Sequence, residues 1–176
     1  MGNIFQAFCR FLDEDDWRYR ALEEKTIIKF GIQGETADFD CFVDIKLDRH
    51  LCILYVIAPN RVPSAKRTQV AEFLTRANYG LILGCFELDM EDGEVRYRTS
   101  VQVEDSEMSQ AMIKTMIYAS IATMEGYYRG LMSIIYGDTT VMEAIKMCEK
   151  RPQEPDEIKA QLENLLEATP DDLPDD

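Results

Sequence analysis

The sequence is poor in the residues that most often perform chemistry in small proteins. It has one histidine, His50, and five cysteines, none of them in a CxxC pair. A zinc site needs clustered cysteine and histidine, and a histidine-based triad could be built only through His50, next to an expected turn. No serine stands in a nucleophile elbow, and the glycine pairs Gly31/Gly34 and Gly80/Gly84 lack the Lys-Ser/Thr of a phosphate loop. We therefore expect no catalytic residues, no cofactor and no metal ligands.

Basic residues are also scarce. The chain has 19 Lys and Arg against 33 Asp and Glu, a formal net charge of −14. Such a surface repels phosphates and anionic lipids, so we expect neither nucleic acid nor membrane as a partner. The first twelve residues do not resemble a signal peptide, and the longest apolar stretch, 111–136, is interrupted by Lys114, Glu125 and Arg129. Together with scattered cysteines, read as buried free thiols, this predicts a cytoplasmic protein.

The apolar content is sufficient for one domain. Hydrophobic residues make up 46% of 176 residues, which is enough for the core of one domain. We place this domain, of the α+β class by its pattern of elements, over residues 1–148. Residues 149–176 form an acidic, proline-containing tail with ten acids and three bases, a net charge of −7. Residues 156–168 within it could form a short helix.

Hydrophobic periodicity and turn signals predict the order α-βββ-α-ββ-α(-α), with a five-stranded antiparallel sheet and helices packed on it. The first helix is expected to end before the acids at 13–16 or to continue weakly to Leu22. The long helix is expected to be capped by Asp105 or Ser106, with Ser109 inside its first turn. The expected elements are a helix over 3–12, strands over 26–33, 38–47 and 51–58, a helix over 63–77, a hairpin over 81–103 that turns at Asp92-Gly93, a long helix ending near Ile135, and a short helix ending near Cys148.

Two of the predicted strands differ in pattern. Residues 38–47 alternate, with Asp38, Asp40 and Asp44 on the wetter face and Phe42 as the exception there. Residues 51–58 are apolar on both faces, which favours the central or most covered strand. Paired carboxylates can perform acid–base chemistry when burial separates their pKa values, but these alternate with apolar residues. We interpret them as a solvated face or a place where a basic partner docks.

Charged residues also crowd the hairpin. Its acids are Glu87, Asp89, Glu91 and Asp92. Carboxylates suit a divalent cation, but this spacing does not match a calcium loop, so we interpret them as a solvated turn. Arg96 and Arg98 are expected to pair with Glu87 and Asp89 across the strands.

The long helix is rich in methionine and apolar nearly all round. One sheet can cover only one side of it, so the surplus should meet other helices, a second subunit or a peptide. Apolar residues at helical spacing are also typical of a core. The candidates for a homodimer or protein-binding contact are Met112, Met116, Ile117, Ile121, Met124 and Tyr128.

A family resemblance is carried by the stretch VPSAKRTQVAEFLTRANYGLILGCFELDMEDGEVRYRTSV. Its matching residues are Asn78, Gly84, Phe86-Glu87-Leu88-Asp89, Asp92-Gly93 and Tyr97-Arg98. With these the chain resembles YbjN-domain proteins, particularly the cyanobacterial ones, over about residues 17–148. The order of its elements resembles the fold of type III secretion chaperones.

That resemblance implies a function as well as a fold. The family is described as a sensory transduction regulator without agreed catalytic residues, and the related chaperones are small, acidic, dimeric, cofactor-free and bind extended protein segments. It therefore implies a non-enzymatic, chaperone-like or regulatory protein-binding module that acts as a homodimer. The short helix and acidic tail after Gly137 depart from the chaperones. The alternatives are a small-ligand sensor, with a pocket between sheet and long helix, and a hydrolase or metal enzyme. We expect the working surface on the long helix or on the sheet face that it leaves uncovered.

Overall fold

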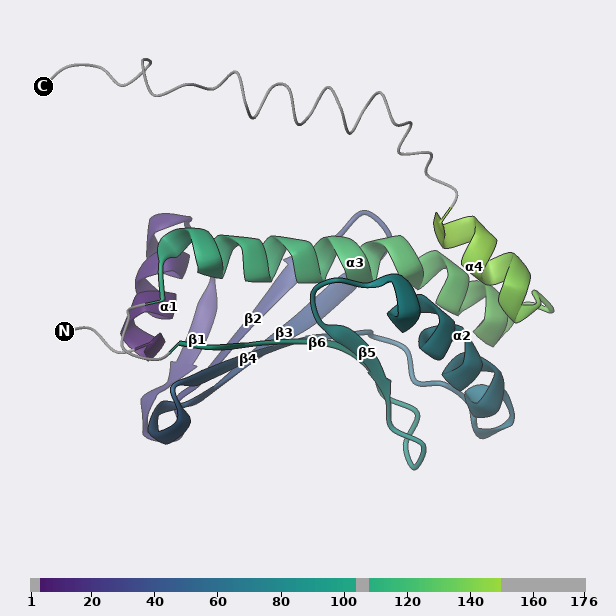
Figure 1. The fold of residues 1–176 in the computed structure, drawn as a ribbon, viewed down its shortest axis with the longest axis horizontal. Coiled ribbons are helices and arrows are strands. Elements are labelled where there is room, and N and C mark those ends of the chain that lie inside the picture. Colours follow the sequence, from purple (N-terminus) through teal and green to yellow (C-terminus); the bar gives the residue numbers. More distant parts are fainter. Residues whose placement is uncertain (1–3, 104–107, 150–176) are drawn as a thin grey trace, which may run out of the picture.

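The computed structural model describes residues 4–103 and 108–149 (Figure 1). Three short 3-10 turns, Glu23–Lys25, Leu47–Arg49 and Ser64–Lys66, join some of its elements. The helices and strands are α1 (Ile4–Glu14), β1 (Tyr19–Leu22), β2 (Ile27–Gln33), β3 (Asp38–Lys46), β4 (Leu51–Ile57), α2 (Arg67–Gly80), β5 (Cys85–Leu88), β6 (Val95–Gln102), α3 (Gln110–Tyr136) and α4 (Val141–Glu149).

The strands form one antiparallel sheet in the order β1-β2-β3-β4-β6-β5. The predicted α+β class and the antiparallel sheet are confirmed, but the sheet has six strands rather than five. The additional strand is β1, whose Tyr19 pairs with Phe30 and whose Leu22 pairs with Ile27. Its four residues are too few to show a period of two, and the pairing with β2 is what orders them.

All four helices leave one face of the sheet free. Figure 1 shows α3 running across the opposite face, with α1 near one end of it and α4 near the other. α1 packs against α3, and α2 packs against α3, α4 and β5. The five apolar residues of α1 are buried in this packing, which agrees with its predicted amphipathic pattern. The core therefore lies between the covered sheet face and the helix layer.

The caps of α3 differ from the prediction. Ser109 is the N-cap, and its Oγ accepts a hydrogen bond of 3.2 Å from the Met112 amide. The helix thus begins one turn after the expected cap at Asp105 or Ser106, both of which lie outside the described residues. So do residues 156–168, where a short helix was predicted. The sequence prediction had placed Ser109 inside the first turn of the helix, whereas it is the capping residue.

Candidate functional site

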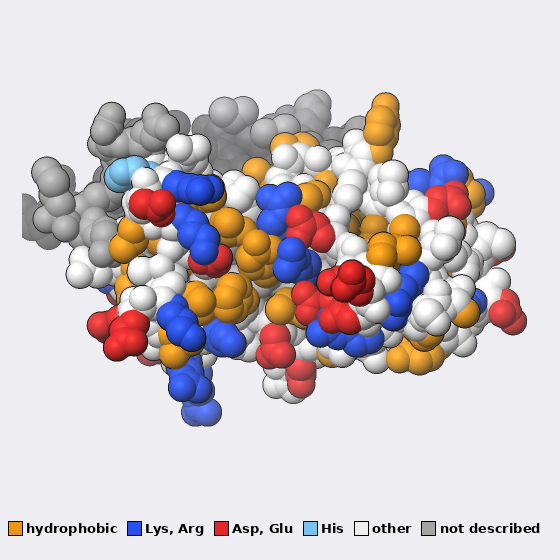
Figure 2. All heavy atoms as spheres, turned by 90° about the horizontal axis from the view of Figure 1, so that it is seen from below, with side chains coloured by type: hydrophobic (Ala, Val, Ile, Leu, Met, Phe, Trp, Pro, Cys, Tyr) orange, Lys and Arg blue, Asp and Glu red, His pale blue; other side chains and the backbone are white. Residues whose placement is uncertain are grey.

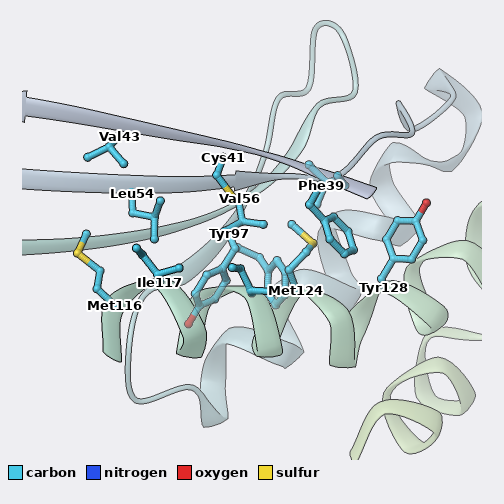
Figure 3. Packing of buried hydrophobic residues seen from close by; sticks show 14 of the residues in the cluster. Phe39, Cys41, Val43, Leu54, Val56, Tyr97, Met116, Ile117, Met124 and Tyr128 are labelled. Atoms are coloured by element: carbon cyan, nitrogen blue, oxygen red, sulfur yellow. The ribbon is translucent and has the colours of Figure 1, made fainter. Parts of the chain in front are cut away.

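The six candidate residues of α3 do not form one surface. Met116, Ile117, Ile121, Met124 and Tyr128 are all buried, and Met112 alone among the six is exposed, at 39%. Figure 3 shows Met116, Ile117, Met124 and Tyr128 pointing from α3 toward the sheet. The apolar residues of this helix that were expected to contact a partner are therefore mostly buried within the domain itself. A partner in contact with α3 would meet other side chains of the helix.

The space between the sheet and α3 is filled by side chains. Phe39 meets Tyr128 edge to face, with 5.4 Å between ring centroids. The hydroxyls of Thr99 and Ser120 are buried in this layer and lie 2.8 Å apart, and Ser120 also donates a hydrogen bond of 2.6 Å to the Met116 carbonyl. The side chains shown in Figure 3 fill the middle of this layer. At its edge, a hollow is lined by the β2–β3 turn and α3, with Gly34, Glu125 and Arg129 among its residues. No helix within the described residues is long and apolar enough to cross a membrane.

The face of the sheet that points away from α3 carries no helix in the described structure. We call it the open sheet face, and Figure 2 shows it with apolar side chains gathered along its middle and charges on both sides. It consists of the strand residues whose neighbours along each strand point into the core. They are Arg20, Leu22, Ile27, Lys29, Gly31, Gln33, Asp38, Asp40, Phe42, Asp44, Lys46, Leu51, Ile53, Tyr55, Ile57, Cys85, Glu87, Arg96, Arg98, Ser100 and Gln102.

One row of this face crosses the whole sheet. The strand register aligns Arg20, Lys29, Phe42, Tyr55, Arg98 and Cys85. At the centre of this row, the ring centroids of Phe42 and Tyr55 lie 6.1 Å apart. The Lys29 ammonium lies 5.5 Å from the Phe42 ring centroid, and the Arg96 guanidinium lies 4.5 Å from that of Tyr55. Cations over ring faces hold the aromatic pair in place and leave its outer surface available for contact.

The aromatic pair continues into an aliphatic stripe. On β4, Leu51, Ile53 and Ile57 flank Tyr55, and all four side chains are half-buried. β4 is central, as predicted, but its second apolar face is not covered by another layer. The signal was present in the sequence, since residues 51–58 are apolar on both faces and Phe42 interrupts the polar face of its strand. A contiguous apolar stripe rimmed by charges is typical of an interaction surface.

Ion pairs order the rim of the stripe. Glu87 accepts hydrogen bonds from Arg96 Nε at 2.7 Å and Arg98 Nε at 2.5 Å, as predicted from the sequence. Burial raises the pKa of Glu87, but the two guanidinium groups outweigh it and hold that pKa below its usual value. Asp44 pairs with Lys46 at 2.8 Å, and its other oxygen is buried without a hydrogen-bond partner in the described structure.

The remaining hairpin acids stabilise the turn. Asp89 Oδ1 accepts hydrogen bonds from the amides of Glu91 at 2.7 Å and Asp92 at 3.3 Å, and these lower its pKa. Asp92 pairs with Arg61 at 3.1 Å. The expected pairing of Asp89 with a strand arginine is therefore wrong, because the turn amides use its carboxylate. Over residues 4–103 and 108–149, no three potential metal ligands come together.

A second exposed apolar feature was not predicted. Tyr79 and Ile82 are each 97% exposed and Leu83 is 48% exposed. They lie at the end of α2 and in the segment that leads from it to β5, and we call residues 79–83 the apolar loop. The sequence prediction began a strand at Leu81, whereas the strand begins at Cys85. The left-handed Gly84, with φ of +73°, separates the loop from the strand.

Comparison with known proteins identifies relatives by sequence and by fold. The YbjN family profile, described as "Putative bacterial sensory transduction regulator", matches residues 6–132. The crystal structure of YbjN, described as a putative transcription regulator from E. coli, is 13% identical with a TM-score of 0.54, covering 74% of this chain and 87% of that chain. A chain of the ExsC–ExsE complex is 11% identical with a TM-score of 0.51, covering 72% and 91%. No curated protein matches. The two structures show a shared fold with YbjN and with the ExsC type III secretion chaperone.

Proposed function

The chain belongs to the YbjN family, and we propose that it is a non-enzymatic, cytoplasmic protein-binding module, chaperone-like or regulatory, that holds a segment of another protein on its open sheet face. The observation that carries this proposal is the uncovered stripe around Phe42 and Tyr55. Apolar side chains there stay half-exposed although the covered face of the same strands is fully buried. The likeness to cyanobacterial members of the family remains a prediction.

The chemistry of the face suits a protein segment. Its centre offers aromatic and aliphatic contact, where binding free energy concentrates in protein interfaces. Its rim offers cations and carboxylates, which set the register of a bound segment more than its affinity. One chaperone of similar fold, ExsC, was solved as a complex with the protein ExsE, which supports the same class of ligand here.

The binding test uses peptides selected by display from a random library against the full chain. Phe42→Ser and Tyr55→Ser should each weaken the selected peptides at least tenfold, because each removes part of the central contact. The matched control is Tyr136→Ser, which removes an exposed tyrosine outside this face. Peptides that bind the Tyr55→Ser variant as tightly as the parent, or a selection without enrichment, would refute the proposal. Circular dichroism melts confirm that each variant folds.

We also propose that the protein acts as a homodimer, with the apolar loop at the contact. Tyr79 and Ile82 are almost fully exposed, which is unusual for large apolar side chains in neighbouring positions. A twofold axis near the loop would bring the two copies of each side chain together. Burial against a second copy would remove this surface from water.

Light scattering after gel filtration tests the dimer. The parent chain should elute with the mass of two chains, and Ile82→Glu should reduce it to one chain without lowering the melting temperature. Met112→Glu serves as the control, since Met112 is an exposed methionine that lies on α3 and not in the apolar loop. A monomeric parent at tens of micromolar, or an Ile82→Glu variant that remains dimeric, would exclude this contact.

A further inference from the structure

The open sheet face differs in charge from the rest of the chain. It carries five bases and four acids, whereas the whole chain has 19 bases and 33 acids. Glu87 and Asp44 are engaged by Arg96, Arg98 and Lys46. Arg20 and Lys29 form no ion pair with any residue of the described structure. Beside the aromatic pair there are thus two cations available to an acidic ligand.

The chain itself contains a segment of matching chemistry. Residues 150–176 have nine acids and three bases, a net charge of −6. Four aliphatic residues are interspersed with these acids in the sequence. They are Ile158, Leu162, Leu165 and Leu166. The segment therefore combines acidic groups for Arg20 and Lys29 with aliphatic groups for the stripe.

The segment is long enough to reach the face. It starts after Glu149, at the end of α4 in the helix layer. Its 27 residues can span about 90 Å when extended. A domain of the described size has a radius of gyration of roughly 15 Å, so a path around the sheet edge is within reach.

We propose that residues 150–176 bind the open sheet face of their own chain and compete there with the protein segment that the face receives. This rests on the proposed function, because both ligands use the same surface. Attachment to the domain places the segment at a high effective concentration, so weak contacts suffice. A partner must displace it, which makes binding conditional on the partner's affinity.

Zero-length carbodiimide cross-linking of the full chain, read by mass spectrometry, tests the contact. Lys29 should form cross-links to the acids of residues 150–176 several-fold more often than Lys114. Lys114 is an exposed lysine on α3 and reports random encounter on the helix side. Equal yields at the two lysines would overturn the proposal. Mixed-isotope cross-links as abundant as single-chain ones, in a mixture of labelled and unlabelled protein at low micromolar concentration, would overturn binding within one chain.

A variant of residues 150–176 distinguishes specific binding to the open sheet face from general charge attraction. Leu162→Ser, Leu165→Ser and Leu166→Ser together keep every charge and remove most of the aliphatic contact. The Lys29 cross-links should fall to the Lys114 level, and displayed peptides should bind about fivefold more tightly if the segment occupies the face about four-fifths of the time. The matched control is Leu173→Ser in the same segment. Unchanged cross-links and unchanged peptide affinity would overturn the proposal.

The two proposals fail differently. Peptides that require Tyr55, together with equal cross-linking at Lys29 and Lys114, would leave the binding face intact and remove the tail from it. Localised cross-links at Lys29, with no peptide that requires Tyr55, would keep the tail contact and remove the proposed function.

Discussion

The side chain of Asn78 closes the outer edge of β5 by binding both backbone groups of Phe86. Its Oδ1 accepts a hydrogen bond of 2.7 Å from the Phe86 amide, and its Nδ2 donates one of 3.0 Å to the Phe86 carbonyl. β5 is an edge strand of the sheet. The Asn78 side chain therefore takes the place of a neighbouring strand and prevents this part of the edge from pairing with other chains. This gives Asn78, one of the residues that carry the resemblance to YbjN proteins, a structural role.

Replacing Asn78 should destabilise the fold. Asn78→Ala removes the partners of two half-buried backbone groups, so we expect the free energy of unfolding to fall by about 2 kcal/mol. Urea denaturation measures the loss. Thr68→Ala, at an exposed position of the same helix, is the control for a change in α2 itself. A loss no larger than that of the control would contradict the role of Asn78.

Charge on the buried side of α3 should unfold the chain. Met116→Asp places a carboxylate where the parent side chain is 2% exposed, and we expect a loss of more than about 3 kcal/mol. Met112→Asp, on the exposed side of the same helix, should cost less than about 1 kcal/mol. Thermal unfolding followed by circular dichroism compares them. Equal losses would show that Met116 is not in the core.

The Glu87 ion pairs should make stability depend on pH. Its folded pKa lies below the ordinary value of 4.5, so this stabilisation is complete above that value and is lost as pH falls through the folded pKa. Glu87→Gln should lower the free energy of unfolding by about 1 kcal/mol at pH 7, a modest figure because both arginines are partly exposed. The difference from the parent should shrink as pH falls below 4.5 through the folded pKa and vanish in strong acid. A difference that persists there would point to packing rather than charge.

The buried thiols should resist alkylation. Burial, with a smaller contribution from Asp40 for Cys41 and Asp44 for Cys52, raises the pKa of each to about 12. Few thiolates exist at pH 8, so both should react with iodoacetamide far more slowly than the half-buried Cys85. Peptide mapping over a time course gives the rates. In urea the rates should converge, and native rates equal to that of Cys85 would contradict the burial.

Local pattern predicted most of the fold. The alternation over 38–47 and the apolar run over 51–58 predicted β3 and β4 closely. The Asp92-Gly93 signal predicted the hairpin turn, where Gly93 has φ of +82° and an added Cβ would lie 2.2 Å from the Val62 carbonyl oxygen. β1 was missed because four residues carry no clear period. At these positions the sequence pattern and the element that it predicts involve the same few neighbouring residues.

The surface that we propose binds a partner was predicted only as one of two alternatives, the long helix or the sheet face that it leaves uncovered. The sequence by itself determined that β4 is apolar on both faces, that α3 is apolar nearly all round, and that acids such as Asp89 belong to turns and rims. Periodicity assigns residues to the faces of one element, but it does not say which face another element will cover. Only the tertiary structure decided that α3 buries Met116 and Met124 against one side of the sheet. That choice left Phe42 and Tyr55 on the other side, because one layer of helices can cover only one face.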